Sequence, residues 1–372
     1  MTIKVCHLTS AHPSTDVRIF YKECSYLAKE KDLYITLVAP GESRRENEVT
    51  VIGVGEKPRS RFKRMFTFTK LVYRVALEQK ADIYHFHDPE LLGAGLKLKR
   101  LGKKVVFDSH EYTYEQIRIK TYIPRLARNI IAKLFHMYET RICSKLDAVI
   151  FPCAVNGKHP FENRASRILY VDNFPALAEF DNINSVEKTN DVCHIGSLDE
   201  DRGITCLLKG IKIANCRLVL GGVFASPEYQ KSLKNAGLLD NVDYKGFCDR
   251  ETVYSIYASS KIGISTILPR GQYTMLGNLP TKIYENMAMG MPVVISDFDY
   301  AKHVLEKYKL GIAVNSENPD EIADAINMLL NNDEIRNEMG KEGRRAVEEE
   351  FNWESEVEKI VKLYNELYKK TN

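Results

Sequence analysis

The chain has 372 residues, of which 44% are hydrophobic and 28% are charged, and its formal net charge is +3. This length exceeds what one hydrophobic core usually serves, so we expect two domains of a soluble globular protein. The net charge is too small to indicate nucleic acid as a partner. No apolar run approaches the ~20 residues that span a bilayer. The first residues, MTIKVCHLTS, enter a strand-like run at once, so we expect a cytoplasmic protein without a signal peptide.

Short β-rich runs alternate with helical patterns over the first 150 residues. We expect helices such as 19–29 and 91–101. The expected strands are 3–8, 34–39, 49–54, 83–86, 104–108 and 148–151. Apolar strands that alternate with helices predict a parallel sheet covered on both faces.

The alternation stops over residues 173–191, a polar stretch that we interpret as a linker, and then restarts. The second set of expected strands is 192–196, 217–221, 242–245, 262–265 and 292–295. The predicted fold class is therefore α/β, with two Rossmann-like, doubly wound domains at 1–175 and 176–350. We expect residues 351–372, with an amphipathic helix at 353–368, to pack back on the first domain. Sheets of this kind bind ligands beyond the carboxyl ends of their strands, which favours a site in the cleft between the domains.

The stretch LPTKIYENMAMGMPVVIS, residues 279–296, has the features of a helix start that binds an anion. Pro280 suits the first turn of a helix, and the free amides of that turn attract negative charge. Thr281, Lys282 and Glu285 fall on one side of the helix. We expect a phosphate at the helix start, Lys282 beside it, and Glu285, which has no evident partner, on the hydroxyls of a ribose. The alternative is a surface ion pair between Lys282 and Glu285.

Five segments, spread over nearly the whole chain, resemble the segments of one protein family and follow the same order. They are HLTSAHPSTDVRIFYKEC (7–24), DIYHFHDPELLGAGLKLKRLGKKVVFDSHE (82–111), IGSLDEDRGI (195–204), LPTKIYENMAMGMPVVISD (279–297) and FNWESEVEKIVKLY (351–364). They resemble the family-four retaining glycosyltransferases, which have the GT-B fold. The resemblance implies a nucleotide-sugar donor held mainly by the second domain, an acceptor held mainly by the first, and retention of configuration at the transferred sugar.

The resemblance also implies roles for individual residues. Glu285 matches the second glutamate of the family's E-x7-E motif, which contacts the donor ribose, but the first glutamate falls on Gly277 here. Arg202 matches a basic residue that neutralises the diphosphate. A second basic residue of the family is replaced by Ser197, and Lys282 is a candidate substitute. His110 matches a histidine that touches the donor sugar.

We therefore expect His110, Arg202, Lys282 and Glu285 to be the catalytic set. The backbone around Gly277 and Asn278 would replace the missing glutamate, and the departing phosphate would take the acceptor proton, since no side chain has the context of a nucleophile. The expected donor-binding residues are Ser197, Gly246, Phe247, Gly277, Asn278, Leu279, Pro280 and Thr281.

Polar residues at strand ends of the first domain are candidates for the acceptor side. We favour this role for His87, Asp88 and Glu90 in YHFHDPE, with structural hydrogen bonds as the alternative. His85 and His87 form an HxH pair, which is weak evidence for a metal site without a third ligand. Asp16 and Arg18 are candidates for substrate contact. Their alternative is a helix entry in which Asp16 is the N-cap and Arg18 is solvated.

Two DxD strings raise the question of a metal ion on the diphosphate. We interpret Asp199-Glu200-Asp201 as a helix start capped by Asp199, and Asp297-Phe298-Asp299 as a turn after a strand. The helix start, Arg202 and Lys282 suffice to stabilise a leaving diphosphate. The eight cysteines show no metal-binding spacing. We therefore expect no metal and no cofactor.

Two basic segments of the first domain indicate contact with an anionic membrane. Residues 57–74 carry seven basic side chains and no acidic one, and residues 118–145 carry seven against one acid. The second segment places an apolar stripe among cations, a pattern of helices that lie on membranes. The stripe is Ile123, Leu126, Ile130, Leu134 and Met137, with Arg125, Arg128 and Lys133 around it. The alternative is a stripe that faces the domain core.

The predicted function is transfer of a hexose or related sugar from a UDP- or GDP-linked donor to a glycan or polyprenyl-linked acceptor. The expected setting is capsule or O-antigen synthesis at the inner face of the cell membrane. Two alternatives stay open. A nucleotide-sugar 2-epimerase shares the fold, and a non-catalytic nucleotide-sugar-binding or partner subunit would explain Gly277.

Overall fold

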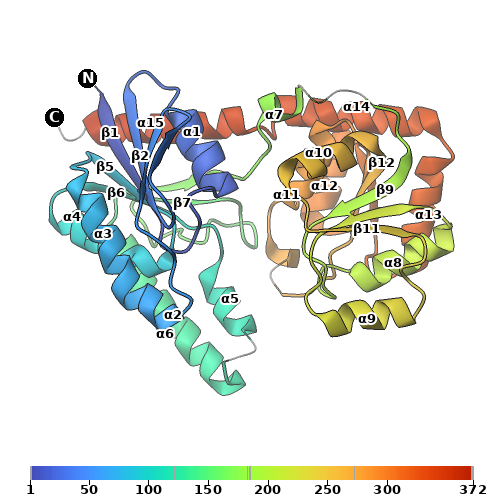
Figure 1. Ribbon diagram of the computed structural model, residues 1–372, viewed down its shortest axis with the longest axis horizontal. Helices are drawn as coiled ribbons and strands as arrows, with labels where there is room; N and C mark the ends of the chain where they lie inside the picture. Colours follow the sequence, from blue (N-terminus) through green and yellow to red (C-terminus); the bar gives the residue numbers. More distant parts are fainter. Residues whose placement is uncertain (1, 121–122, 182, 184–185, 272, 370–372) are drawn as a thin grey trace. The chain divides into compact units, whose positions relative to one another are not determined.

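The computed structural model describes residues 2–120, 123–181, 183, 186–271 and 273–369, and it contains two compact units (Figure 1). Unit 1 consists of Met1–Asn173 and Glu354–Asn372, and unit 2 consists of Phe174–Trp353. The prediction of a linker at 173–191 is wrong for the first half of that range. Phe174 and Phe180 are buried in the core of unit 2, the latter within helix α7 (Leu177–Asp181).

Among the described residues of unit 1, eight strands form one sheet in the order β3-β4-β2-β1-β5-β6-β7-β8. The pairs are parallel except for β3 with β4, a short antiparallel ribbon at one edge. The central strands are buried on both faces, as their aliphatic composition predicts. The strands are β1 (Ile3–Leu8), β2 (Leu33–Ala39), β3 (Arg44–Glu46), β4 (Val49–Gly53), β5 (Ile83–Phe86), β6 (Lys104–Asp108), β7 (Ala148–Phe151) and β8 (Ile168–Tyr170).

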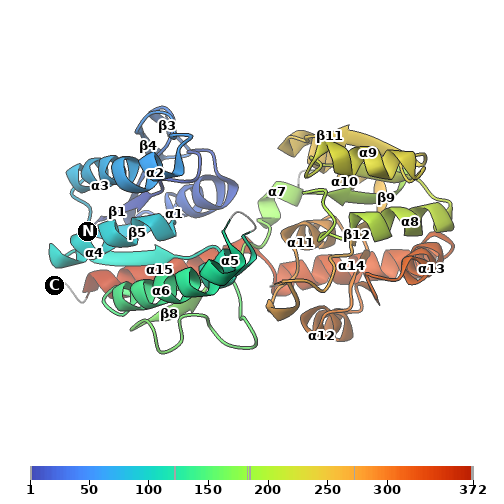
Figure 2. The same cartoon turned by 90° about the horizontal axis from the view of Figure 1, so that it is seen from below.

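Helices cover the sheet of unit 1, with α3, α4 and α6 on one face (Figure 2). The helix expected at 19–29 is instead a π-helical segment, Val17–Cys24, that continues into α1. Asp16 fixes its start, because Asp16 Oδ1 accepts hydrogen bonds from the amides of Arg18 and Ile19. The other helical segments are α1 (Ser25–Leu27), α2 (Arg61–Lys63), the π-helical turn Arg64–Phe68, α3 (Thr69–Glu78), the 3-10 turn Pro89–Leu91, α4 (Leu92–Arg100), α5 (Thr113–Ile119) and α6 (Arg125–Cys143).

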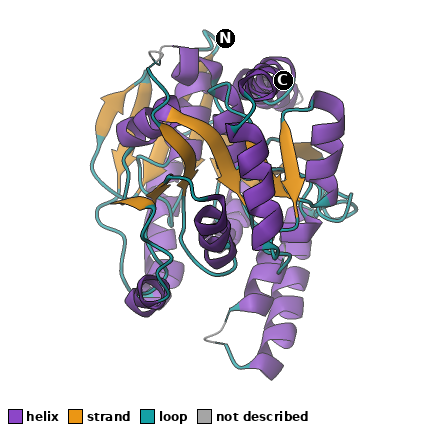
Figure 3. Ribbon diagram, turned by 90° about the vertical axis from the view of Figure 1, so that its right-hand side faces the viewer, coloured by secondary structure: helices purple, strands orange, loops and turns teal. Residues whose placement is uncertain are grey.

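In the described part of unit 2, six parallel strands form a sheet in the order β11-β10-β9-β12-β13-β14, with helices around it (Figure 3). The strands are β9 (Asn190–Ile195), β10 (Leu218–Gly221), β11 (Val242–Gly246), β12 (Ser260–Ser265), β13 (Val293–Ser296) and β14 (Gly311–Val314). The remaining helices are α8 (Ile204–Ala214), α9 (Pro227–Asn235), α10 (Arg250–Ser259), α11 (Thr281–Ala288), α12 (Asp299–Tyr308), α13 (Pro319–Leu330) and α14 (Asp333–Glu349). The prediction of two doubly wound α/β sheets is confirmed, although β3, β8 and β14 were not expected.

Each sheet changes winding direction beside its first strand. The first strand of unit 1, β1, lies between β2 and β5, and the first strand of unit 2, β9, lies between β10 and β12. Ligands of such sheets bind beyond the carboxyl ends of the strands at this switch point. In unit 1 those ends lead into Thr9 and His87, and in unit 2 they lead into Gly196 and Thr266.

The last helix, α15 (Trp353–Lys369), packs on unit 1. The Glu356 carboxylate accepts a hydrogen bond from the amide of Asp172 at 3.0 Å. Tyr364 is fully buried, and its hydroxyl lies 2.6 Å from His85 Nδ1 and 3.0 Å from His7 Nε2. The final segment of the chain thereby completes a polar cluster inside the first unit.

We predict that Tyr364→Phe lowers the stability of the protein by about 1–3 kcal/mol, because it leaves two buried imidazole nitrogens without a hydrogen-bond partner. The midpoint of urea unfolding, followed by circular dichroism, measures this loss. Tyr34→Phe is the matched control, since its hydroxyl contacts Thr50 Oγ1 at an exposed position. Equal midpoints for Tyr364→Phe and the wild type would contradict the prediction.

Candidate functional site

The switch point of unit 2 brings a lysine and a histidine together. Lys282, in the first turn of α11, places Nζ 3.1 Å from Nε2 of His194 in β9. Gly196, just after β9, has a φ of +144°, and a Cβ at this position would lie 2.7 Å from Lys282 Nζ. The glycine therefore leaves the space that the ammonium group occupies. Burial lowers the pKa of Lys282 to about 7, and the Arg202 guanidinium adds to this effect.

Arg202 lies in the loop between β9 and α8. Its amide donates a hydrogen bond to Asp199 Oδ1 at 2.8 Å, and its guanidinium lies over the Tyr273 ring, 4.8 Å from the centroid. Asp199 therefore closes a turn. It is not the cap of α8 that we predicted, because α8 begins at Ile204 after Gly203, whose φ is +74°.

Within the described residues, acids of both DxD strings contact donors or cations of the chain itself. Asp199 accepts a backbone hydrogen bond, whereas Glu200 and Asp201 form exposed ion pairs with Arg270 at 3.4 and 3.3 Å. Asp297 follows β13, as predicted for a turn, and pairs with Lys302. These contacts engage all three acids of the first string and Asp297 of the second.

Glu285 is not the unpaired carboxylate that the sequence suggested. Its Oε1 accepts a hydrogen bond from Arg250 Nη1 at 2.6 Å, and its Oε2 accepts one from Tyr257 Oη at 3.1 Å. Arg250 also donates to Glu179 Oε2 at 2.9 Å. The predicted alternative, a surface pair with Lys282, is also wrong, because Glu285 is buried and Lys282 contacts His194. Each carboxylate oxygen has a second lone pair, so Glu285 can still accept from two hydroxyl groups.

The other predicted donor-binding residues of unit 2 lie at the end of β11, in loops and at the start of α11. Phe247 follows β11 and Gly246, and its side chain is 82% exposed. Ser197 is exposed, and Leu279 is buried, with its amide donating to Tyr284 Oη at 3.0 Å. The remaining members are half-buried in the segment that enters α11 and comprise Gly277, Asn278, Pro280 and Thr281.

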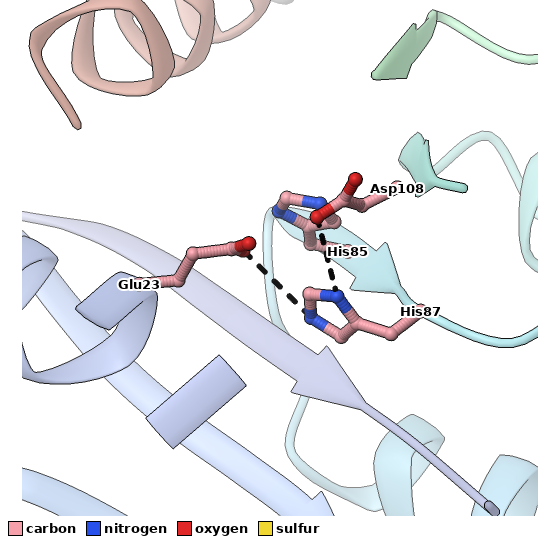
Figure 4. A group of neighbouring side chains, drawn as sticks. All are labelled: Glu23, His85, His87 and Asp108. Atoms are coloured by element: carbon pink, nitrogen blue, oxygen red, sulfur yellow. Dashed lines mark ion pairs between the residues drawn. The ribbon is translucent and has the colours of Figure 1, made fainter. Parts of the chain in front are cut away.

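A fully buried charge cluster lies beneath the strand ends of unit 1 (Figure 4). His87 Nε2 is 3.9 Å from Glu23 Oε2, and His87 Nδ1 is 3.6 Å from Asp108 Oδ2. Arg18 joins both acids, with Nε 3.1 Å from Glu23 Oε1 and Nη2 3.0 Å from Asp108 Oδ2. Burial raises the pKa of Glu23, and Asp108 adds to that rise. Burial opposes the charge of Asp108, but Arg18 and His110 hold its pKa well below the usual range.

Four members of this cluster are of the types that bind a metal ion. One ligand atom from each of Glu23, His85, His87 and Asp108 lies within 4.8 Å of the others. Two imidazoles and two carboxylates form a set that Zn²⁺ accepts. However, Arg18 is already ion-paired to both carboxylates, and its positive charge would repel a cation there. The four residues therefore fit a buried cluster held by Arg18 better than a metal centre.

The cluster reaches the predicted catalytic residue His110. Its Nε2 lies 3.2 Å from Asp108 Oδ2 and 3.2 Å from His87 Nδ1. The imidazole side chain is 16% exposed, so it lies between the buried cluster and the solvent. Asp108 therefore orients the ring of His110, while Arg18 orients Asp108.

The remaining predicted residues of unit 1 hold the loop after β1. Asp88 Oδ2 accepts hydrogen bonds from Thr9 Oγ1 at 2.8 Å and from the Ser10 amide at 2.5 Å. Glu90 accepts from Ser10 Oγ at 2.6 Å and from Arg64 Nε at 2.9 Å. These contacts match the alternative of structural hydrogen bonds for Asp88 and Glu90.

The predictions for Asp16 and Arg18 have different outcomes. Asp16 has the alternative role that we predicted, as the cap of a helical segment, and it also contacts His12 Nδ1 at 3.0 Å. Arg18 is buried, so the alternative of a solvated Arg18 is wrong. Its guanidinium is occupied by Asp108, Glu23 and the carbonyl of Val171, which contradicts a direct contact with substrate.

Comparison with known families assigns both halves of the chain. The family described as glycosyl transferases group 1 matches residues 177–346, and the family described as glycosyltransferase family 4 matches residues 17–157.

The chain is a group 1 glycosyltransferase.

Relatives of this glycosyltransferase support the assignment. An uncharacterized glycosyltransferase of Methanocaldococcus jannaschii is 26% identical over 77% of the chain and 75% of the relative. Phosphatidyl-myo-inositol mannosyltransferase of Mycobacterium leprae is 23% identical over 79% and 75%. Spore coat protein SA of Bacillus subtilis is 37% identical, but the match spans only 22% of each chain.

Solved structures show the same fold. Sucrose-phosphate synthase from Thermosynechococcus elongatus has a TM-score of 0.73 at 15% identity and covers 98% of this chain and 99% of its own. HepE from Anabaena, in complex with UDP and glucose, has a TM-score of 0.72 at 14% identity over 98% and 100%. The predicted GT-B fold of the glycosyltransferase is confirmed. Within the described ranges, no helix has the length and apolar character needed to cross a membrane.

Sequence reasoning missed several partners of the site residues in this glycosyltransferase. His194 could have been found, because it lies two residues before Gly196 at a strand end. Arg250 and Glu179 are 35 and 106 positions from Glu285, and nothing in the local pattern of α11 indicates them. Glu23 and Tyr364 likewise join the unit 1 cluster only through the fold.

Arg18→Met in the glycosyltransferase is expected to cost about 3–5 kcal/mol of stability at neutral pH, because it leaves Asp108 charged and buried without its cation. A depressed carboxyl pKa stabilises the folded state above the unfolded pKa, about 3.9, and this contribution is lost as the pH falls below it. The deficit should therefore shrink below about pH 4. Urea midpoints between pH 3 and pH 7 measure it.

Arg345→Met is the control for this prediction. Arg345 forms ion pairs with Glu342 and Glu349 on the exposed face of α14, so its removal should leave the midpoint unchanged. A deficit for Arg18→Met that does not depend on pH would contradict the role of the Asp108 charge.

Proposed function

We propose that this chain transfers a sugar, with retention of configuration, from a nucleoside diphosphate donor to a glycan or lipid-linked glycan acceptor in surface polysaccharide synthesis. The observation that carries the proposal is the arrangement within unit 2. Lys282 and Arg202 supply positive charge beside the start of α11, and Glu285 lies one turn further along that helix. This order fits a diphosphate followed by its ribose.

The donor diphosphate is the leaving group in this proposal. Charge that develops on the leaving oxygen would meet the Lys282 ammonium, the Arg202 guanidinium and the free amides at the start of α11. Fixed donors of this kind stabilise a transition state without reorganising, and this effect is often the largest single contribution to catalysis. No metal ion is required by this arrangement.

The structure of unit 1 supports a role for His110 on the sugar side of the reaction. Asp108 and His87 engage its Nε2, so Nδ1 is the nitrogen that would accept a hydrogen bond from a sugar hydroxyl. The departing phosphate would take the acceptor proton. Gly277 lacks the carboxylate of the E-x7-E motif, so the backbone of Gly277 and Asn278 would contact the transferred sugar instead.

The names of relatives support the proposed substrates. HepE was crystallised with UDP-glucose, and a kanosaminyltransferase, a mannosyltransferase and an N-acetylglucosaminyltransferase are among the relatives. The mannosyltransferase is named for a phosphatidyl-myo-inositol acceptor and the N-acetylglucosaminyltransferase for poly(ribitol-phosphate). A UDP- or GDP-linked donor and an acceptor at the cell envelope are consistent with these names.

The ribose role of Glu285 predicts discrimination against deoxynucleotides. We expect Glu285→Gln to weaken binding of the preferred nucleoside diphosphate roughly 10- to 100-fold, as loss of hydrogen bonds to a charged group implies. Binding of the 2′,3′-dideoxy analogues should change little. Isothermal titration calorimetry with UDP, GDP, ADP and their dideoxy forms measures both effects.

Glu179→Gln is the matched control for Glu285→Gln. It disturbs the same Arg250 guanidinium but removes no proposed ribose contact, so discrimination should persist. If Glu285→Gln weakens ribose and deoxyribose ligands equally, Glu285 acts only through Arg250. If no nucleotide binds to the wild type, the proposed function is wrong.

Product analysis separates the proposal from its two alternatives. A transferase consumes the nucleotide sugar faster when a glycan or polyprenyl-linked acceptor is added. Conversion of the sugar without any acceptor would indicate a 2-epimerase. Donor binding with neither transfer nor hydrolysis would indicate a non-catalytic subunit.

Exposed apolar side chains support the proposal that unit 1 binds an anionic membrane. On α6, Ile130, Leu134 and Met137 are 63%, 60% and 67% exposed, so these three do not face the core as the alternative required. The side chains of Arg125 and Leu126 lie outside the described residues. In the segment 57–74, Phe62 is 70% exposed, and the cations around it are those identified in the sequence.

Ile130→Asn combined with Leu134→Asn is predicted to weaken binding to phosphatidylglycerol vesicles at least about tenfold, since each buried aliphatic side chain contributes roughly 1.5–3 kcal/mol. Vesicle flotation at low and high salt measures the change. Wild-type binding should fall with salt and be absent on phosphatidylcholine vesicles.

The control replaces an exposed apolar residue of unit 2. Ile213→Asn should leave vesicle binding unchanged, because Ile213 on α8 is 52% exposed but lies outside the basic segments. Equal binding of the wild type to neutral and anionic vesicles would contradict an electrostatic contribution.

A further inference from the structure

The Lys282 amine is held in place before any anion binds. Its Nζ lies 3.1 Å from His194 Nε2, and among the described residues no carboxylate lies within ion-pair distance of it. A half-buried ammonium without a counter-charge is unfavourable, because burial removes much of its hydration. Either a negative charge is missing beside Lys282 in the empty site, or the Lys282 ammonium should lose its proton there.

His194 determines where the Lys282 amine lies. Its Nδ1 lies 2.9 Å from the carbonyl oxygen of Ile264 in β12, and this contact requires the proton on Nδ1. Nε2 then carries a lone pair and accepts a hydrogen bond from Lys282. His194 is fully buried, and burial together with Lys282 keeps its pKa well below the usual range. A neutral acceptor of this kind holds the amine without supplying the missing negative charge.

Among the described residues, the groups that most affect the charge of Lys282 belong to three segments. The strand β9 supplies His194 and Cys193, the following loop supplies Arg202 and Asp199, and α11 itself supplies Glu285. Arg202 disfavours the charge of Lys282, and Asp199 and Glu285 favour it from a distance. Both acids are engaged elsewhere, Asp199 by an amide and Glu285 by Arg250. Burial has the largest effect, so the pKa of Lys282 is lowered overall.

We propose that His194 is a positioning residue for Lys282 and that Lys282 takes up a proton from solvent when a diphosphate binds beside the start of α11. The inference rests on the proposed nucleotide-sugar function and deepens it. The bound anion supplies the missing counter-charge, so the amine becomes a full ammonium only in the complex. The empty donor site then carries the Arg202 charge, and the full charge of Lys282 is added only when the leaving group is in place.

Calorimetry of the wild-type protein tests proton uptake directly. UDP is titrated at pH 7.5 in Hepes and in Tris, whose ionisation enthalpies differ, with GDP in its place if GDP is the nucleotide that binds. From a pKa of about 7 we expect uptake of roughly 0.75 proton per diphosphate bound. Equal apparent enthalpies in both buffers, with nucleotide binding intact, would overturn the inference and leave the proposed function standing.

The pH profile provides the second measurement. Affinity should be highest below pH 7 and fall about 50-fold between pH 7 and pH 9, as Lys282 loses its proton. The nucleotide itself does not cause this fall, because its terminal phosphate, with a pKa near 6, is already ionised. Lys282→Arg keeps its charge at all these pH values and should flatten the profile.

Two further variants complete the test. Lys188→Met removes another lysine of unit 2 whose pKa is lowered by burial and whose Nζ donates to the carbonyl of Ser260, so the profile should be that of the wild type. His194→Phe should weaken UDP binding and shift the midpoint of its pH profile, whereas a merely structural role would leave the midpoint in place. An unchanged midpoint in His194→Phe, or a profile in Lys282→Arg as steep as in the wild type, would contradict the proposal.

Discussion

The buried ion pairs of Arg18 are the interaction on which unit 1 depends. The guanidinium connects the π-helical segment after β1 with Asp108 at the end of β6 and with the carbonyl of Val171, near the end of the unit's first part. A charge in this position is tolerated only because it is paired and hydrogen-bonded. It holds Asp108 ionised, and Asp108 in turn orients His110 at the edge of the buried region. The polar residues at the strand ends are therefore one connected system.

The charged side chains of unit 2 are paired differently from those of unit 1. Glu285 is matched by the donors Arg250 and Tyr257, whereas the Lys282 amine and the Arg202 guanidinium contact a neutral imidazole and an aromatic ring. Positive charge thus remains available at the end of the sheet where ligands of this topology bind. The first turn of α11 adds free backbone N–H groups, which also attract negative charge.

The sequence predicted the fold well because its signal is local. Apolar runs such as 83–86, 104–108 and 148–151 coincide with β5, β6 and β7, since a strand buried on both faces must be apolar throughout. Short edge strands such as Arg44–Glu46 carry no such signal. Arg18 contacts Val171, 153 positions away in sequence, and Glu285 contacts Arg250, 35 positions away, and only the fold brings these residues together. Residue types at strand ends thus indicated where the site lies, but not which charges were already neutralised.

The antiparallel ribbon at the edge of unit 1 has a consequence for the behaviour of the protein in a crowded solution. An exposed parallel edge offers unpaired backbone groups to any other chain that can add a strand. Here the outermost strand, β3, is three residues long and consists of Arg44, Arg45 and Glu46. A strand this short and this charged is a poor template for a further strand. The edge is therefore protected against the sheet-to-sheet association that leads to aggregation.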